Sequence, residues 1–362
     1  MKQLKSRQVC LFIIAFFPIL KIFMLPSILA KHAFEDMWIS AIINIALEFI
    51  SLVLILRACR LAKCNFYQLL ENNLGKFGAK ILLLLYFAFF MLKTIIPLNE
   101  QKDYIVLTLY TLMPNKLYFL PTFVLIFYFC TKPLRVVGRA SDILWFFTII
   151  GLALLVALAI PNANLEAILP VGAQGLKNIL VGSYLSFNWF GDCVYLLFFI
   201  GEFVCTKKDT VKIILSFLLA SLLIVVFMIL FYCVFTSIAF RQRFALTEIS
   251  KYTAVINNIG RFDYIGIVFI LFSNIFALCL PMFFSCKILN YVFSINKKWI
   301  SPLIVVLIQA LILIVFTQYY AGIEKFIINY ASAFFMIMAY VLPAFTLFLT
   351  SKGDKYETNT QS

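Results

Sequence analysis

The chain has 362 residues, of which 64% are hydrophobic and 13% are charged. Soluble domains are about half apolar and about a quarter charged, so this composition excludes an ordinary soluble domain and indicates an integral membrane protein. The formal net charge of +14 is compatible with nucleic-acid binding. In a membrane protein, however, basic loops explain such a charge, and we expect no nucleic-acid partner. The nine cysteines form no C-x-x-C pair, so we expect no disulfide framework, no metal and no cofactor.

Ten apolar segments approach or exceed the length of about 20 residues that a helix needs to cross a bilayer. They are approximately 9–30, 38–58, 80–112, 117–132, 142–160, 178–204, 211–238, 264–293, 300–319 and 326–349. We therefore expect one all-α transmembrane domain over residues 1–349. The polar segment 350–362 is predicted to be a disordered cytoplasmic tail.

Lysine and arginine are concentrated in the loops on one side of these spans. When the N-terminus is placed in the cytoplasm, this group includes the basic start of the chain and the cluster of Arg57, Arg60 and Lys63 after the second span. The positive-inside rule therefore predicts that both the N- and C-termini are cytoplasmic.

Four charged side chains interrupt the spans near mid-depth. They are Lys21, Glu48, Lys93 and Asp192. A charge at the bilayer centre costs about 2.5–3.5 kcal/mol, so we expect these side chains to face the bundle interior and to pair. Lys21 has two candidate partners, Glu48 and Asp192. The network is either a structural set of ion pairs that fixes helix rotation or a relay for a proton or ligand, and the sequence leaves both open.

Two spans also carry residues that break helices. In the first, Pro18 and Pro26 each remove a backbone hydrogen bond. In the sixth, the segment GSYLSFNWFGDCVYLL places Gly191 and Asp192 inside an apolar run. Unwound backbone at this depth is tolerated where it lines a cavity or is buried in protein. An ordinary glycine kink with a hydrogen-bonded aspartate is the alternative.

The broken spans open two blocks of five. These blocks are residues 9–160 and 178–349, and the odd number of spans inverts the second block in the membrane. Discontinuous helices in corresponding positions of two inverted halves point to a central binding site in secondary transporters.

Four segments carry a resemblance to a known family. They are LPSILAKHAFEDMWIS at 25–40, GRASDIL at 138–144, FGDCVYLLFF at 190–199 and IGRFDYIGIVFILF at 259–272. The chain resembles the spore germination permeases, the B subunits of the nutrient germinant receptors of endospore-forming Firmicutes. The resemblance implies the fold of the amino acid–polyamine–organocation superfamily. That fold is a LeuT-like 5+5 inverted repeat of ten transmembrane helices in which helices 1 and 6 are broken.

The resemblance also implies a function. Members sense a nutrient, often an amino acid, in the inner spore membrane and act with an A subunit and a lipoprotein C subunit. A small germinant would then bind between the first and sixth spans and trigger germination. The candidate binding residues are Lys21, Pro26, Ser183, Asn188, Gly191, Asp192 and Tyr195, with Glu48 and Lys93 completing an intramembrane charge network.

Two positions depart from the family pattern. Ile19 and Lys21 stand where members commonly have glycines, and Asp192 stands where many have an apolar residue or a glycine. Lys21 would then supply a fixed positive charge, as a lysine does in place of sodium in some transporters of the superfamily.

Two other classes of function compete with the receptor function. An autonomous secondary transporter of amino acids or related solutes shares the implied fold, and a fold does not settle function. An enzyme is disfavoured, because the chain has one histidine, His32, and lacks both a G-x-S-x-G motif and a phosphate-binding glycine loop. We therefore expect no catalytic residues.

Overall fold

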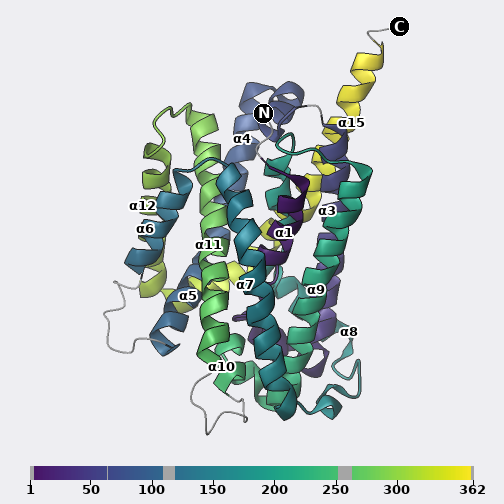
Figure 1. Cartoon of the computed structure of the whole chain (residues 1–362), viewed down its shortest axis with the longest axis vertical. Coiled ribbons are helices and arrows are strands. Elements are labelled where there is room, and N and C mark those ends of the chain that lie inside the picture. Colours follow the sequence, from purple (N-terminus) through teal and green to yellow (C-terminus); the bar gives the residue numbers. More distant parts are fainter. Residues whose placement is uncertain (1–3, 63, 109–118, 252–262, 360–362) are drawn as a thin grey trace.

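The structure is a computed structural model that describes residues 4–62, 64–108, 119–251 and 263–359 (Figure 1). Across these ranges the chain forms helices joined by short connections, and it forms no strand. A helix satisfies its own backbone hydrogen bonds, which an apolar chain in lipid requires. The all-α fold predicted from the apolar segments is confirmed for the described residues.

The first half of the chain contains the predicted break in the first span and an unexpected division of the third. Its helices are α1 (Ser6–Phe16), η1 (Ile19–Lys21), α2 (Leu25–Ala33), η2 (Phe34–Asp36), α3 (Met37–Leu61), α4 (Phe66–Lys93), α5 (Ile95–Thr108), α6 (Phe119–Cys130), α7 (Arg135–Ala159), η3 (Ile160–Asn162) and η4 (Leu165–Ile168). Phe34, with φ 43, turns the chain between α2 and α3. The predicted third span is divided at Thr94 into α4 and α5.

The second half contains the other broken span and a π-helical segment. Its helices are α8 (Gly175–Leu185), η5 (Phe187–Trp189), η6 (Asp192–Phe199), α9 (Lys207–Phe235), η7 (Thr236–Arg241), α10 (Ala245–Lys251), α11 (Asp263–Phe293), α12 (Ile300–Gln318), α13 (Tyr320–Asn329), α14 (Ser332–Met336), the π-helix η9 (Ile337–Val341) and α15 (Leu342–Asn359). Helix α15 continues to Asn359, past the start of the predicted tail at residue 350, and the disorder of that tail stays a prediction. An established helix extends at little further cost, which explains why the polar residues stay helical.

Six stretches are long and apolar enough to cross a membrane. They are Leu25–Leu61, Phe66–Ile105, Arg135–Asn162, Lys207–Arg241, Val268–Phe293 and Ser332–Thr350. Shorter apolar helices cover Leu120–Cys130, Phe187–Phe199 and Ile300–Val315. The first stretch contains the turn at Phe34, so it comprises the short helix α2 and the full-length helix α3. Several membrane helices are therefore confirmed, whereas the count of ten spans stays a prediction.

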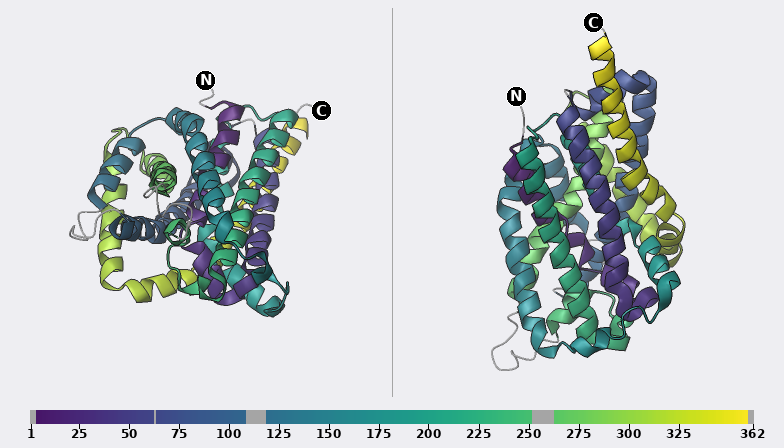
Figure 2. Two further views of the ribbon diagram at one scale, coloured as in Figure 1. Left: turned by 60° about the horizontal axis from the view of Figure 1, so that its bottom comes forward. Right: turned by 90° about the vertical axis from the view of Figure 1, so that its right-hand side faces the viewer.

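The long helices run side by side in a bundle (Figure 1). The start of α1 and the end of α15 lie at one end of the bundle, and α10 lies at the other. Helices α5, α6 and α12 surround α11 (Figure 2, left), and α3 packs between α9 and α15 (Figure 2, right). Helix α1 packs against α7 and α9. This arrangement buries the breaks of both broken spans inside the protein.

Candidate functional site

The first span breaks between α1 and α2. Helix α1 ends at Phe16, η1 ends at Lys21, and α2 begins at Leu25. Pro26 lies in the first turn of α2, where the missing N–H costs nothing because first-turn amides have no partner within the helix. Pro26 therefore starts the second half-helix, and Lys21 is held in the irregular segment between the two halves.

The sixth predicted span breaks between α8 and η6. Phe190 is extended, with φ −103 and ψ −177, and Gly191 is left-handed, with φ 83. Glycine adopts positive φ without the steric penalty that a Cβ brings. A Cβ added to Gly191 would also lie 2.6 Å from the Cβ of Ala339 in η9. The backbone before Asp192 is therefore unwound, as the Gly-Asp pair predicted.

A buried cluster of four charges joins the two breaks. Lys21 and Asp192 form an ion pair, and Nζ of Lys93 lies 3.0 Å from Oδ1 of Asp192. Nζ of Lys21 lies 3.9 Å from Oε2 of Glu48. None of the four side chains is more than 1% exposed. The direct partner of Lys21 is therefore Asp192, while Glu48 lies at the limit of ion-pair distance.

Both lysines also bind backbone carbonyls that the breaks leave free. Nζ of Lys21 donates to the carbonyl of Phe17 at 3.1 Å and lies 3.8 Å from the centroid of the Phe17 ring. Nζ of Lys93 donates to the carbonyl of Asn188 at 3.2 Å and to that of Phe190. Buried ions cost several kcal/mol each unless pairing and hydrogen bonds compensate. The unwound backbone supplies part of that compensation.

A polar stripe on α3 holds the second broken span in place. The stripe consists of the buried residues Ser40, Asn44, Glu48 and Ser51. Their spacing of four, four and three residues puts them on one helix face. Oγ of Ser40 donates to the carbonyl of Ile179 at 2.8 Å, and Nδ2 of Asn44 donates to the carbonyl of Ser183 at 3.0 Å. This half of the stripe fixes α8.

The other half of the stripe reaches the cluster and the π-helix. Oε1 of Glu48 accepts a hydrogen bond from the backbone N–H of Asp192 at 2.7 Å. Oγ of Ser51 donates to the carbonyl of Ala339 at 2.9 Å. The stripe therefore binds both sides of the unwound segment.

Several buried polar groups at the cluster have no hydrogen-bond partner in the part of the chain that the structure describes. They include both polar atoms of the Asn188 side chain, the hydroxyl of Tyr195 and Oε2 of Glu48. Asn188 is 1% exposed. Buried polar groups in proteins are nearly always hydrogen-bonded, so these atoms mark a place where a small polar guest could bond.

The structure brings most of the predicted binding residues together. Those near the breaks are Lys21, Asn188, Gly191, Asp192 and Tyr195. The ring of Tyr195 packs against Phe16 and stacks on Phe90, with centroid distances of 5.1 and 5.2 Å. Ser183 lies further along α8, where its Oγ donates to Oδ1 of Asn44 at 2.7 Å. This contact fixes α8 against α3, and Pro26 starts α2, so both residues position helices. Ligand binding by any of the predicted residues stays a prediction.

Sequence reasoning missed a further polar pair beside the cluster. Oε1 of Glu100 in α5 accepts a hydrogen bond from Nε1 of Trp189 at 3.1 Å, and Glu100 is 4% exposed. Trp189 directly follows Asn188. Glu100 follows Lys93 by seven residues, about two helical turns, and that spacing was the available signal.

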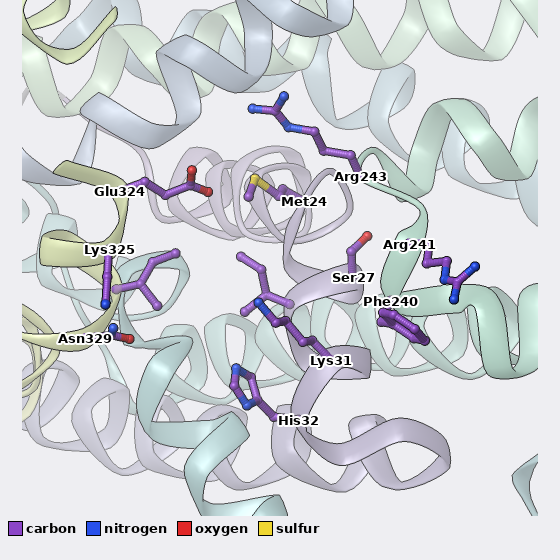
Figure 3. A pocket seen from close by; sticks show the side chains of 12 residues that line it. Met24, Ser27, Lys31, His32, Phe240, Arg241, Arg243, Glu324, Lys325 and Asn329 are labelled. Atoms are coloured by element: carbon purple, nitrogen blue, oxygen red, sulfur yellow. The ribbon is translucent and has the colours of Figure 1, made fainter. Parts of the chain in front are cut away.

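A pocket with a volume of about 610 Å³ lies between α2, the residues at the end of η7 and just after it, and α13 (Figure 3). Met24 lies in its wall, three residues after Lys21, so the pocket reaches the first break. Lys31 and His32 of α2 and Lys325 of α13 also line it. The only histidine of the chain, His32, lies on α2 in this wall. Among the described residues, no group of three or more His, Cys, Asp or Glu side chains could hold a metal ion.

Most of the chain matches the model of a known protein family. The family model described as spore germination protein matches residues 3–325. The chain belongs to this family. The resemblance drawn from the sequence motifs is confirmed over nearly the whole chain. No curated protein matches it.

The family motif in the segment 25–40 has a structural role in this spore germination protein. The carboxylate of Asp36 accepts hydrogen bonds from the N–H groups of Gly172 at 2.7 Å and Gln174 at 3.1 Å. Together with Ser40, Asp36 ties the start of α3 to α8 and to the loop before it. Residues 259–262 of the last motif lie outside the described residues.

Solved structures show a transporter with the same fold. Crystal structures of the manganese transporter of Eremococcus coleocola match with TM-scores of 0.62 for a glutamate-to-glutamine mutant, 0.61 for a histidine-to-alanine mutant and 0.60 for a complex with an aromatic bis-isothiourea substituted compound. In each case the identity is 12%, and the match covers 94% of this chain and 78% of the transporter. The spore germination protein is therefore a membrane protein with a permease-like fold.

Proposed function

We propose that this protein is the ligand-sensing subunit of a nutrient germinant receptor in the inner spore membrane. Its ten spans form two inverted blocks of five, residues 9–160 and 178–349, and both termini are cytoplasmic. It acts with an A subunit and a lipoprotein C subunit, and a small germinant such as an amino acid triggers germination. The observation that carries the proposal is the buried cluster that joins the two broken spans beside the unpaired amide of Asn188.

A ligand acts on this cluster by exchanging with its ion pairs. A ligand carboxylate competes with Asp192 for Lys21 and Lys93, and a ligand ammonium group competes with the lysines for Asp192. Since Lys21 belongs to the first break and Asp192 to the sixth span, either exchange changes how the two are held together. A ligand shifts a conformational equilibrium only through its different affinities for the two states. The exchange of partners provides such a difference.

Lys21 supplies a fixed positive charge in this proposal. Its ammonium group donates to the carbonyl of Phe17 and pairs with Asp192. In transporters, carbonyl groups of unwound helices bind the coupling cation in a similar way. The similar transporter is named for manganese, but two ammonium groups in the cluster repel a divalent cation. We therefore assign this chain no manganese, and we expect its ligand response to be the same in sodium and potassium.

A second candidate function is autonomous secondary transport of amino acids or related solutes. It is favoured by a second pocket of about 410 Å³, which Tyr67, Glu202 and Lys287 help to line. The carbonyl of Glu202 accepts a hydrogen bond from the N–H of Leu4 at 3.1 Å, so this pocket lies toward the end where α1 starts. Pockets on opposite sides of a central site are consistent with alternating access.

Reconstitution separates the two functions. A receptor subunit co-purifies with A and C subunits from spore membranes, and the purified chain in liposomes shows no saturable amino-acid uptake. Spores that lack the chain should lose their response to its nutrient and regain it on complementation. Saturable uptake by the chain alone would contradict the proposal that it senses a ligand without transporting it. If the chain purifies from mildly solubilised spore membranes without A and C subunits, the proposed partnership is wrong.

A further inference from the structure

The pocket beside α2 has basic side chains on facing walls. Lys31 and His32 extend from α2 toward the side where Lys325 lies on α13, whereas Arg241 turns away (Figure 3). The one carboxylate among the lining residues is that of Glu324. A cleft lined by one sign of charge focuses the electric field and raises the local concentration of the opposite charge. The pocket is therefore suited to an anion.

The two lysines are available to a ligand. Neither Lys31 nor Lys325 forms an ion pair or a hydrogen bond with any described residue, and both are exposed. Arg243, also in the lining, is different, because its Nη2 lies 3.0 Å from Oδ2 of Asp103. The positive charge that remains open to a guest therefore belongs mainly to Lys31 and Lys325.

We propose that this pocket binds a small dicarboxylate, with Lys31 and Lys325 each pairing with one carboxylate. Glu324 can accept an α-amino group, so acidic amino acids fit as well. Met24, Ile28 and Ile328 supply apolar wall for the methylene groups between the charges. The volume of about 610 Å³ lies within the range of small-molecule sites, about 300–1,000 Å³. This inference rests on the proposed function and adds to it a second site, outside the buried cluster, at which a ligand of this class acts.

Hydrogen bonds connect the pocket to the first break. Oγ of Ser27 donates to the carbonyl of Gln242, which follows η7. The N–H of Ala245, at the start of α10, donates to the carbonyl of Phe23 at 2.9 Å. The pocket wall, α2 and the irregular segment that carries Lys21 are thus tied together. A guest that bridges α2 and α13 therefore acts on the segment that positions Lys21.

The bridge also reaches the second break. Helix α13 leads through α14 to η9, where Ala339 lies against Gly191. A dicarboxylate held by both walls sets the distance between α2 and α13. It therefore affects the conformation of both helix breaks at once, without entering the buried cluster.

Calorimetric titration of the purified full-length protein in nanodiscs of neutral lipid tests the proposal. The probes are glutarate, L-glutamate and L-glutamine, which keeps the α-amino acid group but has an uncharged side chain in place of the second carboxylate. Because each variant removes a charge-assisted hydrogen bond to a carboxylate, Lys31→Gln and Lys325→Gln should each weaken glutarate binding about tenfold. Lys177→Gln, at an exposed lysine of α8, should leave it unchanged. Glu324→Gln should strengthen glutarate binding and remove any preference for L-glutamate over glutarate.

Three outcomes would each overturn the proposal. One is binding of L-glutamine as tight as that of L-glutamate, and another is no heat from either dicarboxylate at millimolar concentration. The third is dicarboxylate binding that Lys31→Gln and Lys325→Gln both leave intact. The third outcome includes the case in which anionic phospholipid displaces glutarate while the two variants leave glutarate binding unchanged. That result would assign the pocket to lipid. The receptor function is judged separately, by partner co-purification and the germination response.

Discussion

The ammonium group of Lys21 and the carboxylate of Asp192 form an ion pair that links two helix breaks 171 residues apart. The side chains are 0% and 1% exposed, so water does not screen the pair. Removing one partner of a buried pair leaves a buried charge without compensation. The position of the first break is therefore coupled to that of the sixth span.

Lys21→Met should destabilise the protein by about 3–5 kcal/mol, the usual effect of breaking a buried ion pair. Asp192 keeps Lys93 as a partner, so folding should be weakened rather than abolished. The germination response should be lost. Thermal unfolding of the purified protein and a spore germination assay measure the two effects. Asp192→Asn, which leaves two buried lysines without their main partner, should be at least as destabilising.

The double variant Lys21→Met with Asp192→Asn separates a structural pair from a ligand relay. It removes both charges and leaves Lys93 with Glu48, so we expect part of the lost stability to return. A pair that only fixes helix rotation would then recover signalling along with stability. Our proposal expects a stable protein that still fails to respond. A double variant that germinates normally would remove Lys21 and Asp192 from signalling.

Asn44→Leu should loosen α8 from α3. Its side chain bonds the carbonyl of Ser183 and Oγ of Ser186, and it accepts from Oγ of Ser183. Leaving buried partners unsatisfied costs about 1–3 kcal/mol. Hydrogen exchange should therefore quicken at the amides of α8. Asn73→Leu is the matched control, since among the described residues Asn73 bonds only the Leu69 carbonyl of its own helix. Equal exchange in both variants would contradict the role of the stripe.

Local chemistry explains what the sequence could predict. A charge in lipid must find a partner, so the sequence predicts that Lys21, Glu48, Lys93 and Asp192 meet, and the structure brings them together. A Gly-Asp pair inside an apolar run predicts either an unwound backbone or a glycine kink, and Gly191 has the positive φ that unwinding requires. The choice between Glu48 and Asp192 as the partner of Lys21 depends on helix rotation, which no local pattern specifies.

The features that sequence reasoning missed arise from contacts between distant segments. Asn44 and Ser51 lie at helical spacing from Glu48. An uncharged polar residue in a membrane helix costs less free energy than a charged one, so these two residues carry only a weak sequence signal. The pocket forms where α2 meets α13, and no motif connects Lys31 with Lys325. Helix packing brings these residues together, so their shared role becomes visible only in three dimensions.

Thiol labelling should test the orientation of the chain. Cys64 and Cys205 lie outside the membrane helices and are half-buried, and burial raises the pKa of each thiol. We expect a membrane-impermeant maleimide to reach them only from the cytoplasmic face. Because the thiolate is the reactive form, labelling should keep rising with pH beyond about 8.5, the pKa of an ordinary cysteine.

A cysteine in place of Lys177, with Cys64 and Cys205 changed to serine, should be labelled from the opposite face. Lys177 is exposed at the start of α8, and the positive-inside rule predicts that it lies on the outer side. Labelling of this cysteine only in inverted vesicles would reverse the proposed topology.

Gly191→Ala should be among the most damaging small substitutions in the chain. The left-handed conformation costs a residue with a Cβ about 1–2 kcal/mol. The added methyl group would also lie 2.6 Å from the Cβ of Ala339, which is closer than two carbon atoms can approach. We expect a lower unfolding temperature, a loss of germination response, or both, measured on protein expressed at the normal level.

Two further variants separate the two causes. Gly172 has a similar φ of 85 and no atom within 4 Å of an added Cβ, so Gly172→Ala carries the backbone penalty alone and should be milder. Adding Ala339→Gly to Gly191→Ala removes the steric clash and should recover stability, though not the backbone penalty. If the double variant were no more stable than Gly191→Ala, the contact between the sixth span and the π-helix would not be what restricts this position. If it recovers stability but not signalling, the left-handed turn before Asp192 is itself required for the response.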